Sequence, residues 1–184
     1  MNGPRLVVHL ALGSALVVLA DCSRPEVRNE PAKDSEQTPG LVAEDVTQIV
    51  TRDGQKRAEI VSPRLLRYES ERRSSLEGGI TVRFFGAGGR LVSTLTCCRG
   101  AIDESVRTFT AIDSVRLVNL DATVLETDTL RWEEGSERVF GPGRVTIQRG
   151  EGREVGVGFE AESDLSSWTL MEVVTTLVPA DSVR

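Results

Sequence analysis

The feature that most limits how this chain can fold is an alternation of apolar and polar residues with a period of two. In the segment 80–85, the apolar residues Ile80, Val82 and Phe84 are separated by single residues, and similar alternation recurs further along the chain. Such spacing is typical of strands that have one buried and one solvated face. From residue 123 to residue 168, short apolar segments are separated by glycine turns, and none is long enough for a helix. The pattern predicts an all-β fold.

Turn signals recur along the chain. They occur at residues 53–54, 78–79, 86–89, 134–136, 141–143 and 150–152. Together they predict roughly a dozen short strands in an antiparallel sandwich, barrel or jelly roll.

The N-terminal segment has the pattern of an export signal. Residues 6–20 are mostly apolar, and this run is shorter than the roughly 18 to 20 residues that span a bilayer. The sequence Leu19-Ala20-Asp21-Cys22 resembles a bacterial lipoprotein signal, although Asp21 stands where a small uncharged residue is expected. We expect a lipid anchor at Cys22; a cleaved leader with an unmodified cysteine and an uncleaved short anchor are the alternatives.

The domain boundaries follow from these segments. We expect a signal peptide over residues 1–21, a lipidated N-terminus and flexible tether over 22–40, a β jelly-roll domain over 41–178 and a tail over 179–184. The tether is expected to be flexible because it is polar, contains prolines and has little to bury.

Charge and residue content exclude several classes of function. The net charge is −6 and no basic block is present, so nucleic acid is not an expected partner. The only histidine is His9, in the leader, which leaves the domain without the commonest general base and metal ligand. The Gly86–Gly89 turn lacks the lysine that follows in a phosphate-binding loop. We therefore expect no enzyme, no cofactor, no metal and no nucleotide site.

Two further residue groups have plain structural interpretations. Cys97 and Cys98 are adjacent, so one is expected to lie in the core and the other on the surface. Acidic residues cluster in four places, where a solvated strand face, or a turn near Gly135, is the expected setting: Asp103-Glu104, Glu126 with Asp128, Glu133-Glu134, and Glu160-Glu162-Asp164. A carboxylate-based envelope hydrolase would need two of these carboxylates about 5 to 10 Å apart in a cleft, and it is kept as the less favoured alternative.

The order of three motifs resembles the LptC family of lipopolysaccharide export proteins. The motifs are the segments Leu125–Trp132, Gly143–Ile147 and Gly156–Leu165, and the resemblance extends over about Val46 to Leu177. It implies an elongated, twisted, boat-like antiparallel β jelly roll with an apolar groove. The family's best-known members carry a transmembrane helix, whereas this leader resembles a lipoprotein signal, and nothing in the family pattern requires the vicinal cysteines.

The resemblance also implies a function. The protein is expected to be held in the periplasm, at the inner membrane, where the groove would accept lipopolysaccharide from an inner-membrane ABC transporter and pass it to the next bridge protein. The candidate groove residues are the inward-facing apolar ones: Ile60, Leu65, Val82, Phe84, Leu95, Phe109, Val115, Leu117, Leu125, Leu130, Val145, Ile147 and Phe159.

The two ends of the domain are expected to meet partner proteins. The segment from Ser166 to Val178 is too apolar for a free edge, and we expect it to pair with the next bridge jelly roll by strand addition. Its candidate residues are Trp168, Leu170, Met171 and Val173. The segment from Val46 to Thr51 is expected to face the transporter. A structural envelope lipoprotein with a closed, filled core remains an alternative.

Overall fold

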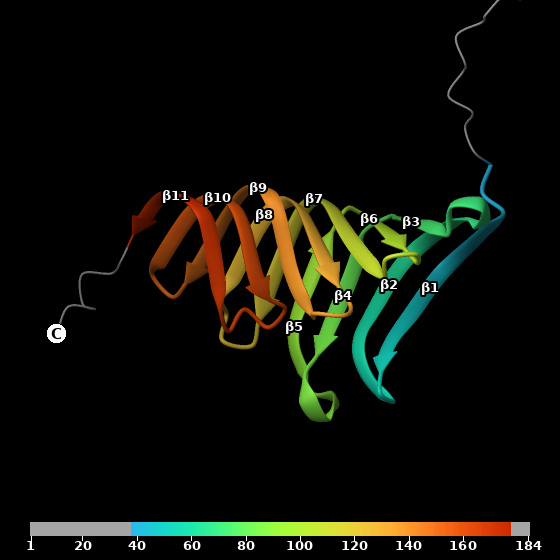
Figure 1. Cartoon of the computed structure of the whole chain (residues 1–184), viewed down its shortest axis with the longest axis horizontal. Coiled ribbons are helices and arrows are strands. Elements are labelled where there is room, and N and C mark those ends of the chain that lie inside the picture. The colour runs from blue at the N-terminus through green and yellow to red at the C-terminus, as the bar shows by residue number, and fades with distance from the viewer. Residues whose placement is uncertain (1–37, 178–184) are drawn as a thin grey trace, which may run out of the picture. The chain divides into compact units, whose positions relative to one another are not determined.

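The computed structural model describes residues 38–177, which form eleven strands and two short 3₁₀ segments (Figure 1). The strands are β1 (Leu41–Arg52), β2 (Gln55–Tyr68), β3 (Arg73–Glu77), β4 (Ile80–Phe85), β5 (Leu91–Cys97), β6 (Arg99–Asp103), β7 (Thr108–Asn119), β8 (Val124–Glu133), β9 (Arg138–Arg149), β10 (Gly152–Glu162) and β11 (Trp168–Leu177). The 3₁₀ segments are η1 (Glu69–Glu71) and η2 (Ala87–Gly89). The predicted signal peptide, the Cys22 anchor, most of the tether and the tail lie outside the described residues.

All strand pairs are antiparallel, and two long strands organise the sheet. Along its length β2 pairs first with β4 and then with β3, and β7 pairs first with β6 and then with β5. Since β4 also pairs with β5, and β3 with β6, the sheet closes into a ring between β2 and β7. From this ring β1 extends on one side, and β8, β9, β10 and β11 extend in order on the other. This is the predicted antiparallel jelly roll.

The ring requires each long strand to bend, so that it contributes to two facing walls. Wall A contains β3 and β6, together with the halves of β2 and β7 that pair with them. Wall B contains β4 and β5, together with the other halves of β2 and β7. The outer strands continue each wall in the same way. The bends coincide with breaks in the ladders at Asp113 and Ser114, which have positive φ angles, and at Gly158, with φ 72°. We call the line through these bends the bend line.

One predicted turn is a bend of this kind. The segment Gly141-Pro142-Gly143 lies inside β9, where the pairing with β8 is interrupted between Val145 and Phe140. Glycine and proline interrupt the ladder here, but the chain continues in the same general direction. For the same reason several strands have 10 to 14 residues and are longer than the short strands expected from the sequence. The predicted turn at Asp53-Gly54 is confirmed, with φ angles of 51° and 74° that suit a two-residue hairpin.

The core lies between the two walls. All thirteen candidate groove residues belong to one buried apolar cluster and are at most 5% exposed. Cys97 is buried and Cys98 is exposed, as the sequence predicted. The interior is therefore aliphatic, with a small number of aromatic rings.

Candidate functional site

A cavity opens between the two walls at the end of the sheet next to β1. It has a volume of about 370 Å³, near the lower end of the range for ligand sites. Wall B contributes Gln48, Ile49, Val50 and Ile60, and wall A contributes Ile102, Asp103, Glu104, Arg107, Thr108, Phe109, Trp132 and Glu134. We call this space the port. Since Ile60, Phe109 and Trp132 also belong to the buried cluster, the port leads directly into the core.

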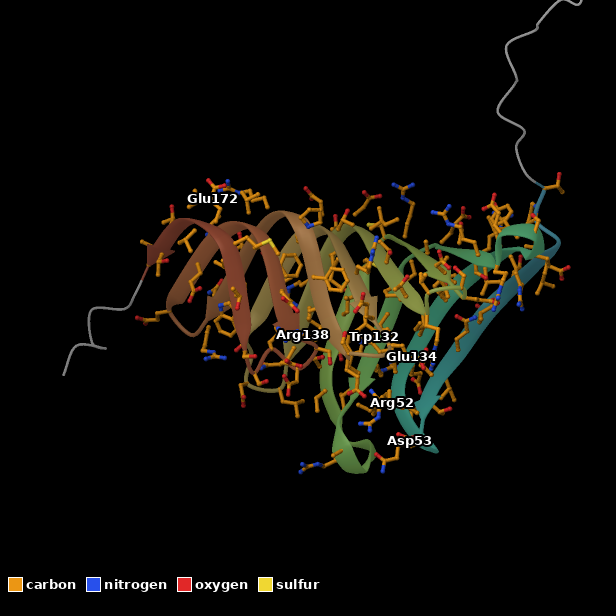
Figure 2. All side chains as sticks on the ribbon, in the orientation of Figure 1. Arg52, Asp53, Trp132, Glu134, Arg138 and Glu172 are labelled. Atoms are coloured by element: carbon orange, nitrogen blue, oxygen red, sulfur yellow. The ribbon has the colours of Figure 1, made fainter. Side chains whose placement is uncertain are left out.

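Aromatic rings form the inner end of the port. Trp132 and Phe109 are register partners on wall A, and the Trp132 ring lies 5.3 Å from that of Phe84 on wall B. Figure 2 shows Trp132 and Glu134 close together, at the β8 end of the port. The two walls are thus in contact behind the port, and the surface at its inner end is apolar.

Charged residues surround the apolar part of the port and are largely paired with one another. The Arg107 guanidinium donates from Nε to Glu134 at 3.0 Å, and Glu134 raises the pKa of Arg107. Arg67 donates to Glu104, also at 3.0 Å. Hydrogen bonds from Ser105 lower the pKa of Asp103. The rim of the port is therefore made of paired, charged side chains, in contrast to its apolar inner end.

Polar contacts join the walls along the edge opposite the bend line, which we call the mouth. Among residues 38–177, no strand pairing crosses this edge. The contacts from wall B to wall A are Arg52 Nη1 to the Gly135 carbonyl (3.0 Å), Ser93 Oγ to the Ser163 carbonyl, Asn119 Nδ2 to the Asp164 carbonyl (3.0 Å) and Arg149 Nη2 to the Leu165 carbonyl (3.3 Å). Beneath them Leu165 is fully buried and closes the core.

Comparison with known families identifies the chain. The model of the family described as "Lipopolysaccharide-assembly, LptC-related" matches residues 6–178. The chain belongs to this family. Its members are proteins of lipopolysaccharide assembly, so the resemblance seen in the motifs is confirmed.

Two further comparisons complete this result. The LptC-related chain is similar to the crystal structure of LptH, the LptA homologous periplasmic component of the conserved lipopolysaccharide transport device from Pseudomonas aeruginosa. The TM-score is 0.49 and the sequence identity 10%, and the match covers 66% of this chain and 94% of that chain. No significant match was found among curated proteins.

The candidate groove residues of this LptC-related protein all face its interior. Ile60 and Phe109 line the port, whereas the other eleven candidates lie elsewhere in the buried core. The list did not include Trp132, although it shares the buried face with Leu130, two positions earlier, and this spacing could have identified it. Val50 and Ile102 were also missed, because their partly buried positions at the port depend on how the two walls meet.

The candidate partner residues divide into two groups. Trp168 and Leu170 are partly buried and pack against the core, whereas Met171 and Val173 are 72% and 60% exposed. Strand β11 pairs only with β10, and β1 pairs only with β2, so each has a free edge in the part of the chain described. Figure 1 shows these two strands at opposite ends of the β body.

The acidic clusters form ion pairs. Glu160 and Glu162 both contact Arg138, at 2.9 and 3.6 Å, and Glu126 lies 3.5 Å from Arg116. Within residues 38–177, no three side chains of the types that ligate metals come together, and no helix has the length and apolar character needed to cross a membrane.

Proposed function

We propose that this protein is a periplasmic carrier in lipopolysaccharide export, which accepts the acyl chains of lipopolysaccharide between its two walls and passes them to the next protein of the system. The observation that supports this most directly is the port, because it joins an outside opening to a continuous aliphatic core in a member of a lipopolysaccharide-assembly family. Each methylene moved from water into such a core contributes about 0.8 kcal/mol.

Lipid deeper than the port requires the walls to separate. The inner candidate residues have almost no exposed surface, so an acyl chain reaches them only if the mouth opens. Opening the mouth breaks side-chain contacts and leaves every strand ladder intact, which makes it the least costly way to part the walls. The protein would then work as a clamp that hinges at the bend line.

The energy for transfer is proposed to come from a partner. The chain has no phosphate-binding loop, so the proposed source of lipid and energy is an inner-membrane ABC transporter. Strand β1 is the proposed contact with it, through Val46 to Thr51. At the other end, β11 is proposed to add to a strand of the next bridge jelly roll, since exposed apolar side chains and a free edge occur together there.

The β11 contact can be tested by truncation. A chain that ends at Ser167 lacks β11 and is expected to lose co-purification with the bridge protein, whereas a chain that ends at Leu177 keeps the strand and is expected to retain it. Retention by the shorter chain would count against strand addition at this edge.

Anchoring through Cys22 is a separate proposal. Metabolic labelling with a fatty-acid probe is expected to mark the wild-type protein and not Cys22→Ser. Equal labelling of the two proteins would reject the lipoprotein anchor, and a membrane-bound, unlabelled wild type would favour an uncleaved leader.

Photocrosslinking tests the lipid path. A benzophenone amino acid at Val50 or Ile102, the partly buried port positions, is expected to trap lipopolysaccharide in cells. The matched controls are Arg116 and Thr146, which alternate with the inward residues on their strands. Equal yields at port and control sites would reject the port as the site of lipid binding.

The sealed core also favours a second candidate, a structural envelope lipoprotein whose interior never opens. The near-zero exposure of the inner residues supports it. In that case crosslinkers at the port would trap protein partners only, and no lipid would co-purify with the chain.

A further inference from the structure

The indole N–H of Trp132 is buried without a hydrogen-bond acceptor. The side chain is 2% exposed and its Nε1 has no partner among the described residues. The second tryptophan differs, because Trp168 Nε1 donates to Glu154 Oε2 at 3.1 Å. Buried tryptophan N–H groups usually find a partner, and leaving one unpaired lowers stability. Phenylalanine would fill much of the same space without this cost.

The unpaired N–H belongs to a ring that lines the port. No rim carboxylate accepts a hydrogen bond from Trp132 Nε1, and those of Glu134 and Glu104 are held by Arg107 and Arg67. An occupant that satisfies Trp132 must therefore bring its own acceptor. It must also be mainly hydrocarbon, because Ile60, Ile102 and Phe109 form the neighbouring surface.

An acyl chain that ends in an ester or amide carbonyl has both properties. Its methylenes suit the aliphatic surface, and its carbonyl oxygen is an acceptor one bond from the start of the chain. The port is lined by three carboxylates, those of Asp103, Glu104 and Glu134, against one guanidinium, that of Arg107, which already binds Glu134. This excess of negative charge favours a neutral carbonyl over a free fatty acid.

We propose that Trp132 Nε1–H donates a hydrogen bond to the carbonyl oxygen at the head of an acyl chain bound in the port, and that this bond makes the port prefer acyl-linked over ether-linked chains. The inference rests on the proposed function, in which the interior takes acyl chains. It adds the chemical feature of the lipid that the protein recognises and the residue that recognises it.

A matched pair of lipids tests the proposal. The probes are a short-chain diacyl phosphatidylcholine and its diether analogue with the same chains and headgroup, both below their micelle concentrations. The wild-type protein is expected to bind the diacyl lipid about tenfold more tightly, which corresponds to about 1.4 kcal/mol. Trp132→Phe is expected to bind both lipids with the affinity that the wild type shows for the diether.

The matched control is Trp168→Phe, which removes the other indole N–H and is expected to keep the tenfold preference. A preference that survives in Trp132→Phe, or an equal loss of affinity for both lipids, would overturn the role of the N–H. Failure of the wild type to bind either lipid would overturn this inference, whereas failure of Val50 and Ile102 to crosslink lipopolysaccharide would overturn the proposed function, so the two failures are distinguishable.

A second measurement needs no change at Trp132. In the ¹⁵N-labelled wild type, the indole proton resonance of Trp132, assigned with the Trp168→Phe protein, is expected to move downfield on addition of the diacyl lipid. It is expected to move much less with the diether. Identical shifts with the two lipids would contradict the proposed hydrogen bond.

Discussion

Arg52, at the end of β1, lies across the mouth from Glu137 in the β8–β9 hairpin, with Nη1 3.4 Å from Oε1. The same carboxylate oxygen is 3.4 Å from Arg57 Nε on β2, although that contact lacks hydrogen-bond geometry. One wall A carboxylate thus attracts two wall B guanidinium groups. Glu137 is 29% exposed, so solvent screens the contacts only in part.

Glu137→Gln is expected to loosen the mouth while keeping the size of the side chain. The loss of two partly screened ion contacts should lower the free energy of unfolding by about 0.5 to 1 kcal/mol. Hydrogen exchange should quicken in the 134–137 hairpin, and lipid should load faster. The control is Asp53→Asn, since the Asp53 side chain is 89% exposed and 4.0 Å from Arg52. Equal exchange in the two variants would show that Glu137 does not hold the mouth.

The bend in β9 predicts a difference between two nearby glycines. A Cβ on Gly141 would lie 2.6 Å from the Thr129 carbonyl oxygen and 2.8 Å from the Phe159 ring, whereas a Cβ on Gly143 would meet nothing within 4 Å. Gly141→Ala is therefore expected to lower the free energy of unfolding by about 1 to 3 kcal/mol. Gly143→Ala should change it by less than about 0.5 kcal/mol. Chemical denaturation measures both, and equal effects would contradict the close packing at Gly141.

These glycines also show what the sequence could and could not predict. Alternation and turn residues were sufficient for the strands, the inward faces and the Asp53-Gly54 hairpin, because each depends on neighbours within a few residues. The bend at Gly141 was predicted as a turn, since a glycine that ends a strand and one that lets Phe159 approach look alike in sequence.

The port shows the same limit at longer range. Ile60 and Phe109 were predicted to face inward from alternation alone. The cavity that they share with Val50 and Ile102 is set by how β1 meets the β6–β7 hairpin across the walls, which alternation does not encode. Whether the Trp132 N–H has a hydrogen-bond acceptor likewise depends on atoms from distant strands.

The vicinal cysteines give a prediction that depends on pH. Burial raises the pKa of the Cys97 thiol from its ordinary value of 9.0 to about 11. The thiol also donates a hydrogen bond to the Arg99 carbonyl, 3.1 Å from Sγ. At pH 8 the folded Cys22→Ser protein is therefore expected to be alkylated by iodoacetamide at Cys98 and not at Cys97. Mass spectrometry of the digested protein identifies the site, and denatured protein should be alkylated at both.

The raised pKa also fixes how Cys97 affects stability. Because the fold favours the neutral thiol, its contribution to stability is complete below about pH 9 and declines as the pH rises towards 11. The free energy of unfolding of the Cys22→Ser protein should fall between pH 8 and pH 10.5. The same protein with Cys97→Ala should be less stable at pH 8, but its stability should fall less over this range. If the loss is the same in both proteins, Cys97 does not titrate with a raised pKa.

The exposed apolar end of the sheet supports a last prediction about β11. A Cβ on Gly156 would lie 2.7 Å from the Glu172 carbonyl oxygen and 3.1 Å from Leu170, so β11 packs directly on this glycine. Gly156→Ala is expected to displace β11 and to weaken capture of the bridge protein several-fold, while lipid crosslinking at Ile102 is unchanged, because the port lies at the opposite end of the sheet order. The control Gly150→Asn leaves the β9–β10 hairpin with a residue that tolerates its φ of 57°. Loss of lipid crosslinking together with loss of the partner, in a Gly156→Ala protein that still folds, would reject the separate roles of the two ends.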